Sequence, residues 1–224
     1  MLALRLYLLP LLIALTLALA LGDALSAPEA RIGEDQLRRV ENRYGSKARA
    51  RVIAWEQMLN GDRSGGDQAK LERVNAYFNE LAFVSDSEHW GRDDYWATPV
   101  EFLASGAGDC EDFSVAKYFT LRQLGVPIER LRLVYAKAVK LNEAHMVLAY
   151  FPTPQADPLI LDNLVPEIRP ASRRQDLVPV YSFNGDGLWL AKQRGQGNRV
   201  GSSRRLGLWK DLQDRMLEVL PDAH

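Results

Sequence analysis

The chain has 224 residues, of which 47% are hydrophobic and 25% charged, a composition typical of one ordinary globular domain. Its 28 basic and 29 acidic residues give a formal net charge of −1, so no overall positive field would attract nucleic acid. We therefore expect no nucleic-acid partner.

The first segment of the chain has the pattern of an export signal. An almost unbroken apolar run from Leu6 to Leu21 follows Arg5, and Ala18-Leu19-Ala20 suits a signal peptidase. The run has about 16 residues, fewer than the roughly 20 that span a bilayer comfortably. We predict that residues 1–27 are a cleaved signal peptide and that residues 28–224 form a single exported domain that is not embedded in a membrane. An uncleaved anchor is the alternative.

Helices are predicted in the N-terminal third of the chain. Apolar residues recur every three or four positions from Glu34 to Leu59 and again from Asp67 to Leu81, on either side of a glycine-rich break at residues 60–66. Residues 85–107 are loop-rich and include Trp90 and Trp96. These aromatic side chains either line a cleft or form a small core beneath the loop.

One more helix and a series of strands are predicted next. Glu111–Leu124 is expected to be an amphipathic helix that ends at Gly125-Val126-Pro127. Beyond it the apolar period changes to two, which predicts strands over Leu131–Val139, Glu143–Tyr150, Leu159–Leu161, Val178–Phe183 and Leu188–Ala191. Residues 192–205 are expected to form a solvated loop, and residues 208–220 a terminal amphipathic helix. Helices followed by antiparallel strands are typical of an α+β fold.

Cys110 is the only cysteine in the chain, and it lies where a turn containing Gly106 and Gly108 leads into the predicted helix. Exported proteins usually pair their cysteines, but this one cannot form an internal disulfide. Either the thiol is buried and inert, or it is a nucleophile activated by the helix N-terminus and an adjacent imidazolium. The backbone N–H groups of that helix end could also bind an oxyanion.

His145 and Asp162 follow Cys110 in the order of a thiol-catalysis triad, each in an apolar, strand-like segment. In that interpretation, His145 takes the thiol proton and Asp162 holds the imidazole in the correct tautomer. The other histidine candidate, His89, lies in a polar loop, and His224 is terminal. The opposing interpretation is that His145 is a structural residue of the core.

Three acidic residues flank the thiol: Asp109, Glu111 and Asp112. Their charges oppose formation of a thiolate, so something should offset them. One interpretation is helix capping by Asp109 with Asp112 in the first turn. The other is a calcium site, because clustered carboxylate oxygens are the ligands that Ca²⁺ prefers.

Four separate motifs together resemble the bacterial transglutaminase-like cysteine proteinases of the LapG type. They are Asp94-Tyr95-Trp96-Ala97-Thr98-Pro99-Val100-Glu101-Phe102, Gly108-Asp109-Cys110-Glu111-Asp112, Ala144-His145-Met146-Val147-Leu148 and Leu161-Asp162-Asn163. The resemblance runs from about Trp90 to Trp189. It implies a papain-like, transglutaminase-like core and a triad of Cys110, His145 and Asp162. It also implies calcium dependence through Asp109 and Glu111, with Asp112 as a further candidate ligand.

The resemblance also implies a place in the cell and two partners. Members of that family are periplasmic proteases that cut the N-terminal region of a large surface adhesin near a pair of alanines, which releases biofilm cells. An inner-membrane receptor that senses cyclic di-GMP sequesters them, and Trp90 and Trp96 are expected to be exposed enough to contribute to such an interface. Two alternatives stand beside the protease: a transglutaminase-type acyl transferase, and a non-catalytic, calcium-dependent binding module with an inert Cys110.

Overall fold

The computed structural model describes residues 31–61, 65–190 and 197–219. Its helices are α2 (Glu34–Tyr44), α3 (Ser46–Asn60), α4 (Asp67–Phe78), α5 (Asp86–His89), α6 (Pro99–Ser105), α7 (Cys110–Gln123) and α8 (Gly207–Val219), with 3₁₀ turns η1 (Ile128–Arg130), η2 (Ala171–Arg173) and η4 (Ser203–Arg205). The predicted signal peptide at residues 1–27 lies outside the described residues. Within those residues, no helix combines the length and the apolar character needed to cross a membrane.

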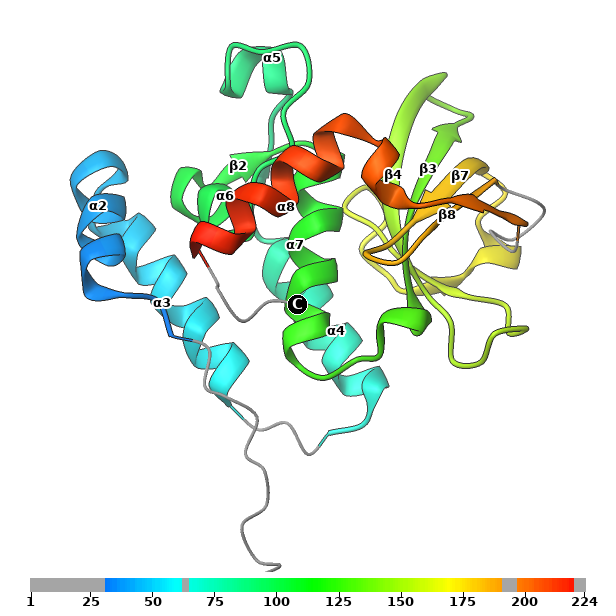
Figure 1. Ribbon diagram of the computed structural model, residues 1–224, viewed down its shortest axis with the longest axis horizontal. Helices are drawn as coiled ribbons and strands as arrows, with labels where there is room; N and C mark the ends of the chain where they lie inside the picture. The colour runs from blue at the N-terminus through cyan, green and yellow to red at the C-terminus, as the bar shows by residue number, and fades with distance from the viewer. Residues whose placement is uncertain (1–30, 62–64, 191–196, 220–224) are drawn as a thin grey trace, which may run out of the picture.

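The main sheet is antiparallel, with strand order β6-β5-β4-β3-β7-β8-β9. Its strands are β3 (Leu131–Ala138), β4 (Glu143–Tyr150), β5 (Leu159–Leu161), β6 (Arg169–Pro170), β7 (Leu177–Phe183), β8 (Leu188–Leu190) and β9 (Arg199–Gly201). Two short strands, β1 (Ala82–Phe83) and β2 (Ala107–Gly108), pair separately in parallel. Figure 1 shows the helices on one side of the molecule and the sheet on the other, with α7 between them. This arrangement confirms the predicted α+β class.

Helix α7 is buried on nearly all sides. Its Asp112–Leu121 segment is buried throughout, whereas an amphipathic helix with one solvated face was predicted. The prediction was wrong because neighbours pack on several sides of this helix. Trp55 of α3 donates a hydrogen bond to Thr120 (2.8 Å), and Phe102 of α6 contacts Phe113 (4.8 Å between ring centroids). A helix enclosed in this way sets the position of whatever stands at its N-terminus.

Three other elements differ from the sequence prediction. The expected helix from Glu34 to Leu59 is two helices, because Gly45 has φ +86°, a conformation that glycine adopts without strain. The expected loop at residues 85–107 contains α6, which begins with a reciprocal capping box between Thr98 and Glu101 and has Pro99 in its first turn. The expected loop at residues 192–205 contains β9, which pairs with β8.

The aromatic side chains of the segment before Cys110 are packed inward. Trp96 is 4% exposed and stacks on Phe183 at 5.7 Å, whereas Trp90 is half-buried against Tyr95. The structure therefore favours a core beneath the loop. The expectation that Trp96 is an exposed contact for a receptor was wrong, because the sheet covers its ring.

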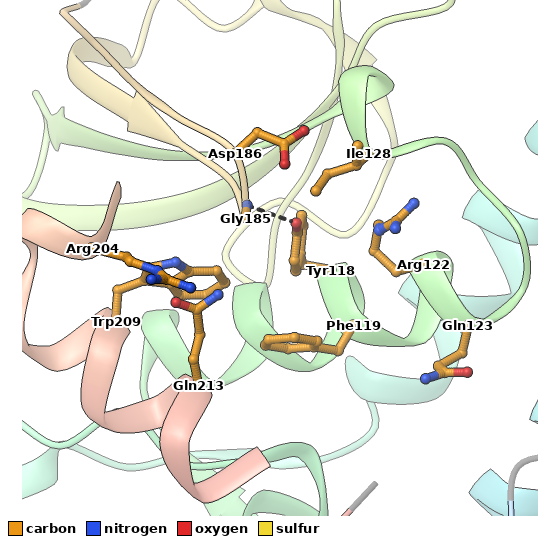
Figure 2. Close-up of a pocket in the computed structure, with 10 residues that line it drawn as sticks. All are labelled: Tyr118, Phe119, Arg122, Gln123, Ile128, Gly185, Asp186, Arg204, Trp209 and Gln213. Carbon is orange, nitrogen blue, oxygen red and sulfur yellow. Dashed lines mark hydrogen bonds between the residues drawn. The ribbon is translucent and has the colours of Figure 1, made fainter. Parts of the chain in front are cut away.

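A cavity of about 300 Å³ lies beside the C-terminal half of α7 (Figure 2). Tyr118, Phe119 and Trp209 line it, and the Gly185 N–H donates to the Tyr118 hydroxyl at 3.0 Å. Tyr118 is eight residues beyond Cys110, about 12 Å along a helix at 1.5 Å per residue. This cavity is therefore separate from the surroundings of the thiol.

Candidate active site

Cys110 is the first residue of α7 and lies against β4. Asp109 caps the helix, because its Oδ1 accepts a hydrogen bond from the Glu111 N–H at 3.2 Å. One turn along the helix, the Ser114 hydroxyl donates to the Met146 carbonyl at 3.0 Å. The Met146 backbone also hydrogen-bonds the Cys110 sulfur. Since Met146 directly follows His145, these contacts bring the thiol and the imidazole segment together.

His145 and Asp162 form a buried hydrogen-bonded pair. Nε2 of His145 lies 2.8 Å from Oδ1 of Asp162, and both side chains are buried. The sheet produces this contact: β5 pairs with β4 through Leu161 and Leu148, and Asp162 directly follows β5. With Nε2 directed at the carboxylate, Nδ1 is the nitrogen left to exchange a proton with the thiol.

The Asp162 carboxylate is held in its ionised form. Burial raises its pKa, but the hydrogen bond from His145, the attraction of that ring when charged, and the bonds from Leu164 N–H (3.0 Å) and Arg174 (2.6 Å) outweigh burial. The pKa of Asp162 is about 2 as a result. The carboxylate is therefore a permanent acceptor for the His145 N–H near neutral pH.

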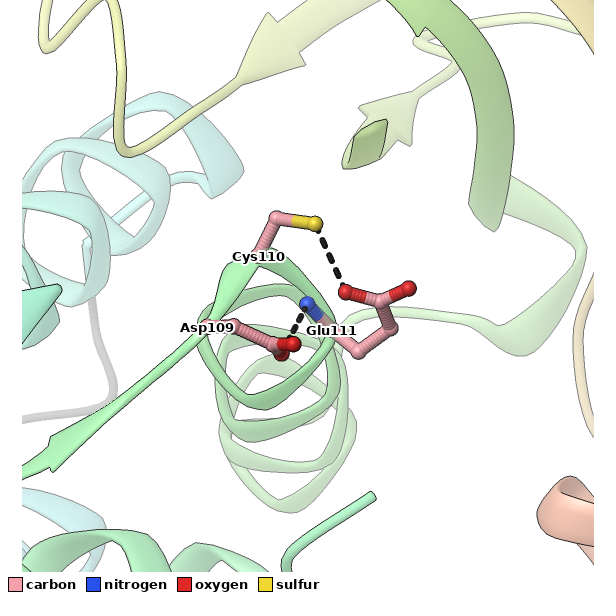
Figure 3. Close-up of side chains that lie close together, drawn as sticks. All are labelled: Asp109, Cys110 and Glu111. Atoms are coloured by element: carbon pink, nitrogen blue, oxygen red, sulfur yellow. Dashed lines mark hydrogen bonds between the residues drawn. The ribbon is translucent and has the colours of Figure 1, made fainter. Parts of the chain in front are cut away.

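The Cys110 thiol points to Glu111 in this structure. Its Sγ donates to Oε2 of Glu111 at 2.6 Å, as Figure 3 shows. Burial raises the pKa of the Cys110 thiol, the charges of Glu111 and Asp109 raise it further, and the Met146 backbone hydrogen bond opposes them. The arrangement thus fits a protonated thiol, and a thiolate requires that the neighbouring negative charge be offset.

Asp109 belongs to two overlapping groups of possible metal ligands. In one, its carboxylate lies with the Cys110 sulfur and the Glu111 carboxylate; in the other, with Asp86 and Asp112, and within each group the ligand atoms are within 4.8 Å of one another. The structure therefore places all three acids that the sequence suggested in these two groups, which share Asp109. It adds Asp86 from α5, which the sequence analysis missed.

The group of Asp86, Asp109 and Asp112 fits a bound cation. Asp86 and Asp112 are almost completely buried, yet Oδ1 of Asp86 and Oδ2 of Asp112 have no hydrogen-bond partner. Burial raises the pKa of Asp109 to about 8 and that of Asp86 to about 6, and repulsion between neighbouring carboxylates adds to both shifts. Burial likewise raises the pKa of Asp112. Unpaired buried carboxylate oxygens are costly, and a divalent ion would remove that cost.

Gly108 leaves the space that Asp112 occupies. A Cβ at this position would lie 2.2 Å from Oδ2 of Asp112 and 2.9 Å from its Cβ. We expect Gly108→Ala to displace Asp112, to destabilise the fold by about 1–3 kcal/mol as overpacked cores do, and to reduce the rise in Tm that is expected if calcium binds this group.

The matched control for this substitution is Gly66→Ala, because a Cβ at Gly66 meets nothing within 4 Å. Thermal unfolding of both variants with calcium and with EGTA gives the measurement. A Gly108→Ala protein that shows the wild-type rise in Tm on calcium addition would contradict a role of Asp112 as a calcium ligand.

Two further residues near the triad had no signal in the sequence. Arg174 contacts Asp162 from the segment before β7, and Lys117 lies buried on α7. Burial lowers the pKa of Lys117 to about 7, while the charge of Asp162 opposes this shift. Both would be read from the sequence as solvated surface charges, as would Asp86, because only tertiary packing places them around the site.

Comparison with known proteins identifies the family of the chain. Residues 54–189 match the family described as bacterial transglutaminase-like cysteine proteinase, and that segment contains Cys110, His145 and Asp162. The match covers more than half of the chain. This chain belongs to that family. The family accounts for the mixed fold and for a nucleophilic cysteine as the reactive group.

Solved structures of LapG from Legionella pneumophila resemble the chain over most of its length. One is 44% identical in sequence, covers 84% of this chain and 99% of its own, and has a TM-score of 0.71. A form treated with EGTA has a TM-score of 0.72 at 44% identity, and a calcium-bound form has 0.69 at 45%. No curated protein matches the sequence. That LapG has therefore been solved both in a calcium-bound form and after treatment with EGTA.

Proposed function

We propose that the protein is a calcium-dependent cysteine endopeptidase of the periplasm, with Cys110 as nucleophile, His145 as general base and acid, and Asp162 as the residue that orients the imidazole. The observation that carries this proposal is the buried His145–Asp162 hydrogen bond of 2.8 Å beside the strand segment that contacts Cys110. Membership of a cysteine proteinase family supports it.

The chemistry follows from the positions of these groups. Nδ1 of His145 takes the Cys110 proton, and the sulfur attacks the carbonyl carbon of the scissile peptide bond. N–H groups at the start of α7 stabilise the oxyanion, and the imidazolium then protonates the leaving amine. Water attacks the resulting thioester with His145 again as base, which releases the acid product and restores the thiol.

Calcium would be held by Asp109 and Asp112 together with Asp86, while Glu111 is a further ligand candidate on the Cys110 side of Asp109. When bound, the ion supplies positive charge that offsets the carboxylates beside the thiol. Asp109 and Glu111 both raise the pKa of Cys110. Neutralising them therefore favours the thiolate.

We propose as substrate the N-terminal region of a large surface adhesin, cut near a pair of alanines so that biofilm cells are released. The test is incubation of the calcium-loaded protein with N-terminal fragments of candidate adhesins, followed by mass spectrometry of the products. Fragments in which the alanine pair is replaced by bulky residues serve as controls. If Cys110 reacts with iodoacetamide but none of the fragments is cut, the proposed adhesin substrate is wrong, while the assignment of Cys110 as the nucleophile still holds.

Acyl transfer to an amine is the competing reaction, because it begins with the same thioester. Adding a primary amine to the cleavage assay separates the two. Hydrolysis gives a free carboxylate at the cut, whereas a transglutaminase would give an amide of the added amine. A non-catalytic binding module would show neither product and no rapid alkylation of Cys110.

We also propose that the mature protein lies in the periplasm and is sequestered there by the periplasmic domain of an inner-membrane cyclic di-GMP receptor. The support for the receptor is family membership alone, since Trp96 is buried. Sequencing of the mature N-terminus tests export, with a start near residue 21 or 27 expected. Calorimetry with the periplasmic domains of such receptors from the same genome tests the partner, and absence of binding to all of them would contradict the proposed sequestration.

A further inference from the structure

Arg174 is a buried arginine shared by two carboxylates. It follows η2 and is 4% exposed. Its Nη2 donates to Oδ2 of Asp162 at 2.6 Å and to Oδ2 of Asp176 at 2.8 Å, and its Nε donates to Oδ1 of Asp176 at 3.0 Å. The Asp162 carboxylate has no exposed surface, whereas Asp176 is partly exposed.

The stability of the fold alone does not account for this placement. Moving a guanidinium and a carboxylate out of water costs free energy that their attraction only partly returns, so apolar residues of similar volume often replace such pairs without loss of stability. A buried pair beside a reacting histidine has a different use, because it fixes the geometry of the carboxylate that the histidine needs. We propose that Arg174 is a positioning residue of the Cys110–His145–Asp162 site, which acts by holding the Asp162 carboxylate in register with the imidazole.

The two oxygens of Asp162 have separate donors, and this division supports the proposal. Oδ1 accepts from Nε2 of His145 and from the Leu164 N–H, while Oδ2 accepts from Arg174. The carboxylate cannot rotate about its Cβ–Cγ bond without losing contacts at both oxygens. Arg174 therefore keeps Oδ1 on Nε2, which keeps Nδ1 available for the thiol.

The main chain of Asp162 is fixed independently of Arg174. The Asn79 side-chain amide donates to the Asp162 carbonyl at 2.9 Å, and Lys117 donates to Oδ1 of Asn79 at 2.7 Å. Lys117 belongs to α7, the helix that carries Cys110. Because these bonds hold the backbone of residue 162, loss of Arg174 should free the carboxylate without releasing the segment.

The proposal rests on the proposed function, and its test separates the two. The rate of Cys110 alkylation by iodoacetamide at one neutral pH, with calcium present, needs no substrate. In parallel, the proton of ¹⁵N-labelled His145 that bonds Asp162 gives a low-field NMR signal, assigned by its loss in His145→Ala. The variants are Arg174→Gln and Arg174→Lys. The control is Arg132→Gln, whose guanidinium packs on Phe151 and Trp189, away from the triad.

We expect Arg174→Gln to slow alkylation roughly 10- to 100-fold, by analogy with the loss found when a residue that orients a metal ligand is removed, and to weaken the His145 proton signal. Where a peptide substrate is available, kcat should fall with KM unchanged. Arg174→Lys should retain an intermediate rate, and Arg132→Gln the wild-type rate and signal.

A wild-type alkylation rate with an intact His145 signal in Arg174→Gln would overturn the role of Arg174. If that variant does not fold, Arg174→Lys decides: a lowered rate at unchanged Tm supports the proposal, and a wild-type rate overturns it. If wild-type Cys110 reacts no faster than Cys110 in His145→Ala, the proposed catalytic pair fails instead.

Discussion

Cys110→Ser and His145→Ala are each expected to abolish proteolysis and to leave the fold intact. Nucleophile and base act as one unit, so removing either should lower kcat/KM by a factor of about 10⁴ or more. Serine closely matches the size of cysteine and can donate the same hydrogen bond to Glu111, and the helix end is capped by Asp109, which the substitution leaves in place. Circular dichroism and Tm should therefore stay near wild type while cleavage of a substrate fragment is lost.

Asp162→Asn is expected to be comparably severe for a different reason. Oδ1 of Asp162 accepts from Nε2 of His145, and an amide NH₂ in its place would favour a proton on Nδ1, the nitrogen that must receive the thiol proton. The wrong tautomer cannot act as base toward Cys110. Because Arg174 also donates to this side chain, the asparagine variant should lose some stability as well.

His89→Ala is the matched control for the histidine. His89 lies on α5 against Trp90 at 4.6 Å between ring centroids, and its ring has no part in the triad. Full activity is expected in this variant. Near-wild-type turnover of Cys110→Ser with unchanged circular dichroism would show that the nucleophile lies elsewhere. Loss of activity in His89→Ala would indicate that His89, rather than His145, is the general base.

The elements set by local sequence were mostly predictable. The predicted strands gave β3, β4 and β5 within a residue of their observed bounds. A strand buried on one face leaves an alternation of apolar and polar residues in the sequence, and a strand buried on both faces leaves a short apolar run. Two local signals were present but not used: the Thr98-Pro99-Val100-Glu101 pattern of a capping box, which begins α6, and Gly45, which ends α2.

The site was predictable only in part. Cys110, His145 and Asp162 are distinguished by residue type and order, so their candidacy could be read without coordinates. Asp86 and Arg174 are common surface residue types, and only packing buries them. The burial of α7 was hidden for the same reason, since Asp112 and Lys117 suggest a solvated face where the structure has a buried group of carboxylates that could hold a cation and a contact with Asn79.

Calcium removal is expected to stop cleavage reversibly and to lower Tm, with the larger loss of stability at higher pH. Burial raises the pKa of Asp109 to about 8 and that of Asp86 to about 6. A carboxyl with a raised pKa in the folded protein keeps its proton when the unfolded chain has lost it. Without calcium, the stability that these groups contribute is therefore complete below the unfolded value near 4 and is lost as pH rises through about 6 to 8.

Calcium should replace these protons, so its effect should grow over the same pH range. At about 100 times its Kd, an ion that binds only the folded state stabilises it by about 2.7 kcal/mol. The measurement is Tm at pH values below 6 and above 8, each with calcium and with EGTA. Magnesium should substitute poorly, because it demands a tight octahedron and loses water reluctantly.

Single substitutions can show which of the two groups that share Asp109 holds the ion. Asp109→Asn should weaken calcium binding whichever group holds the ion, because Asp109 belongs to both carboxylate groups. If the ion lies with Asp86 and Asp112, whose buried oxygens have no other partner, then Asp86→Asn should weaken calcium binding more than Glu111→Gln does. The exposed Asp93 of the same segment provides the control, Asp93→Asn, with no change expected. Full activity in EGTA, together with no heat of calcium binding in calorimetry, would leave Asp109 as a helix cap and would require another source of positive charge beside the Cys110 thiolate.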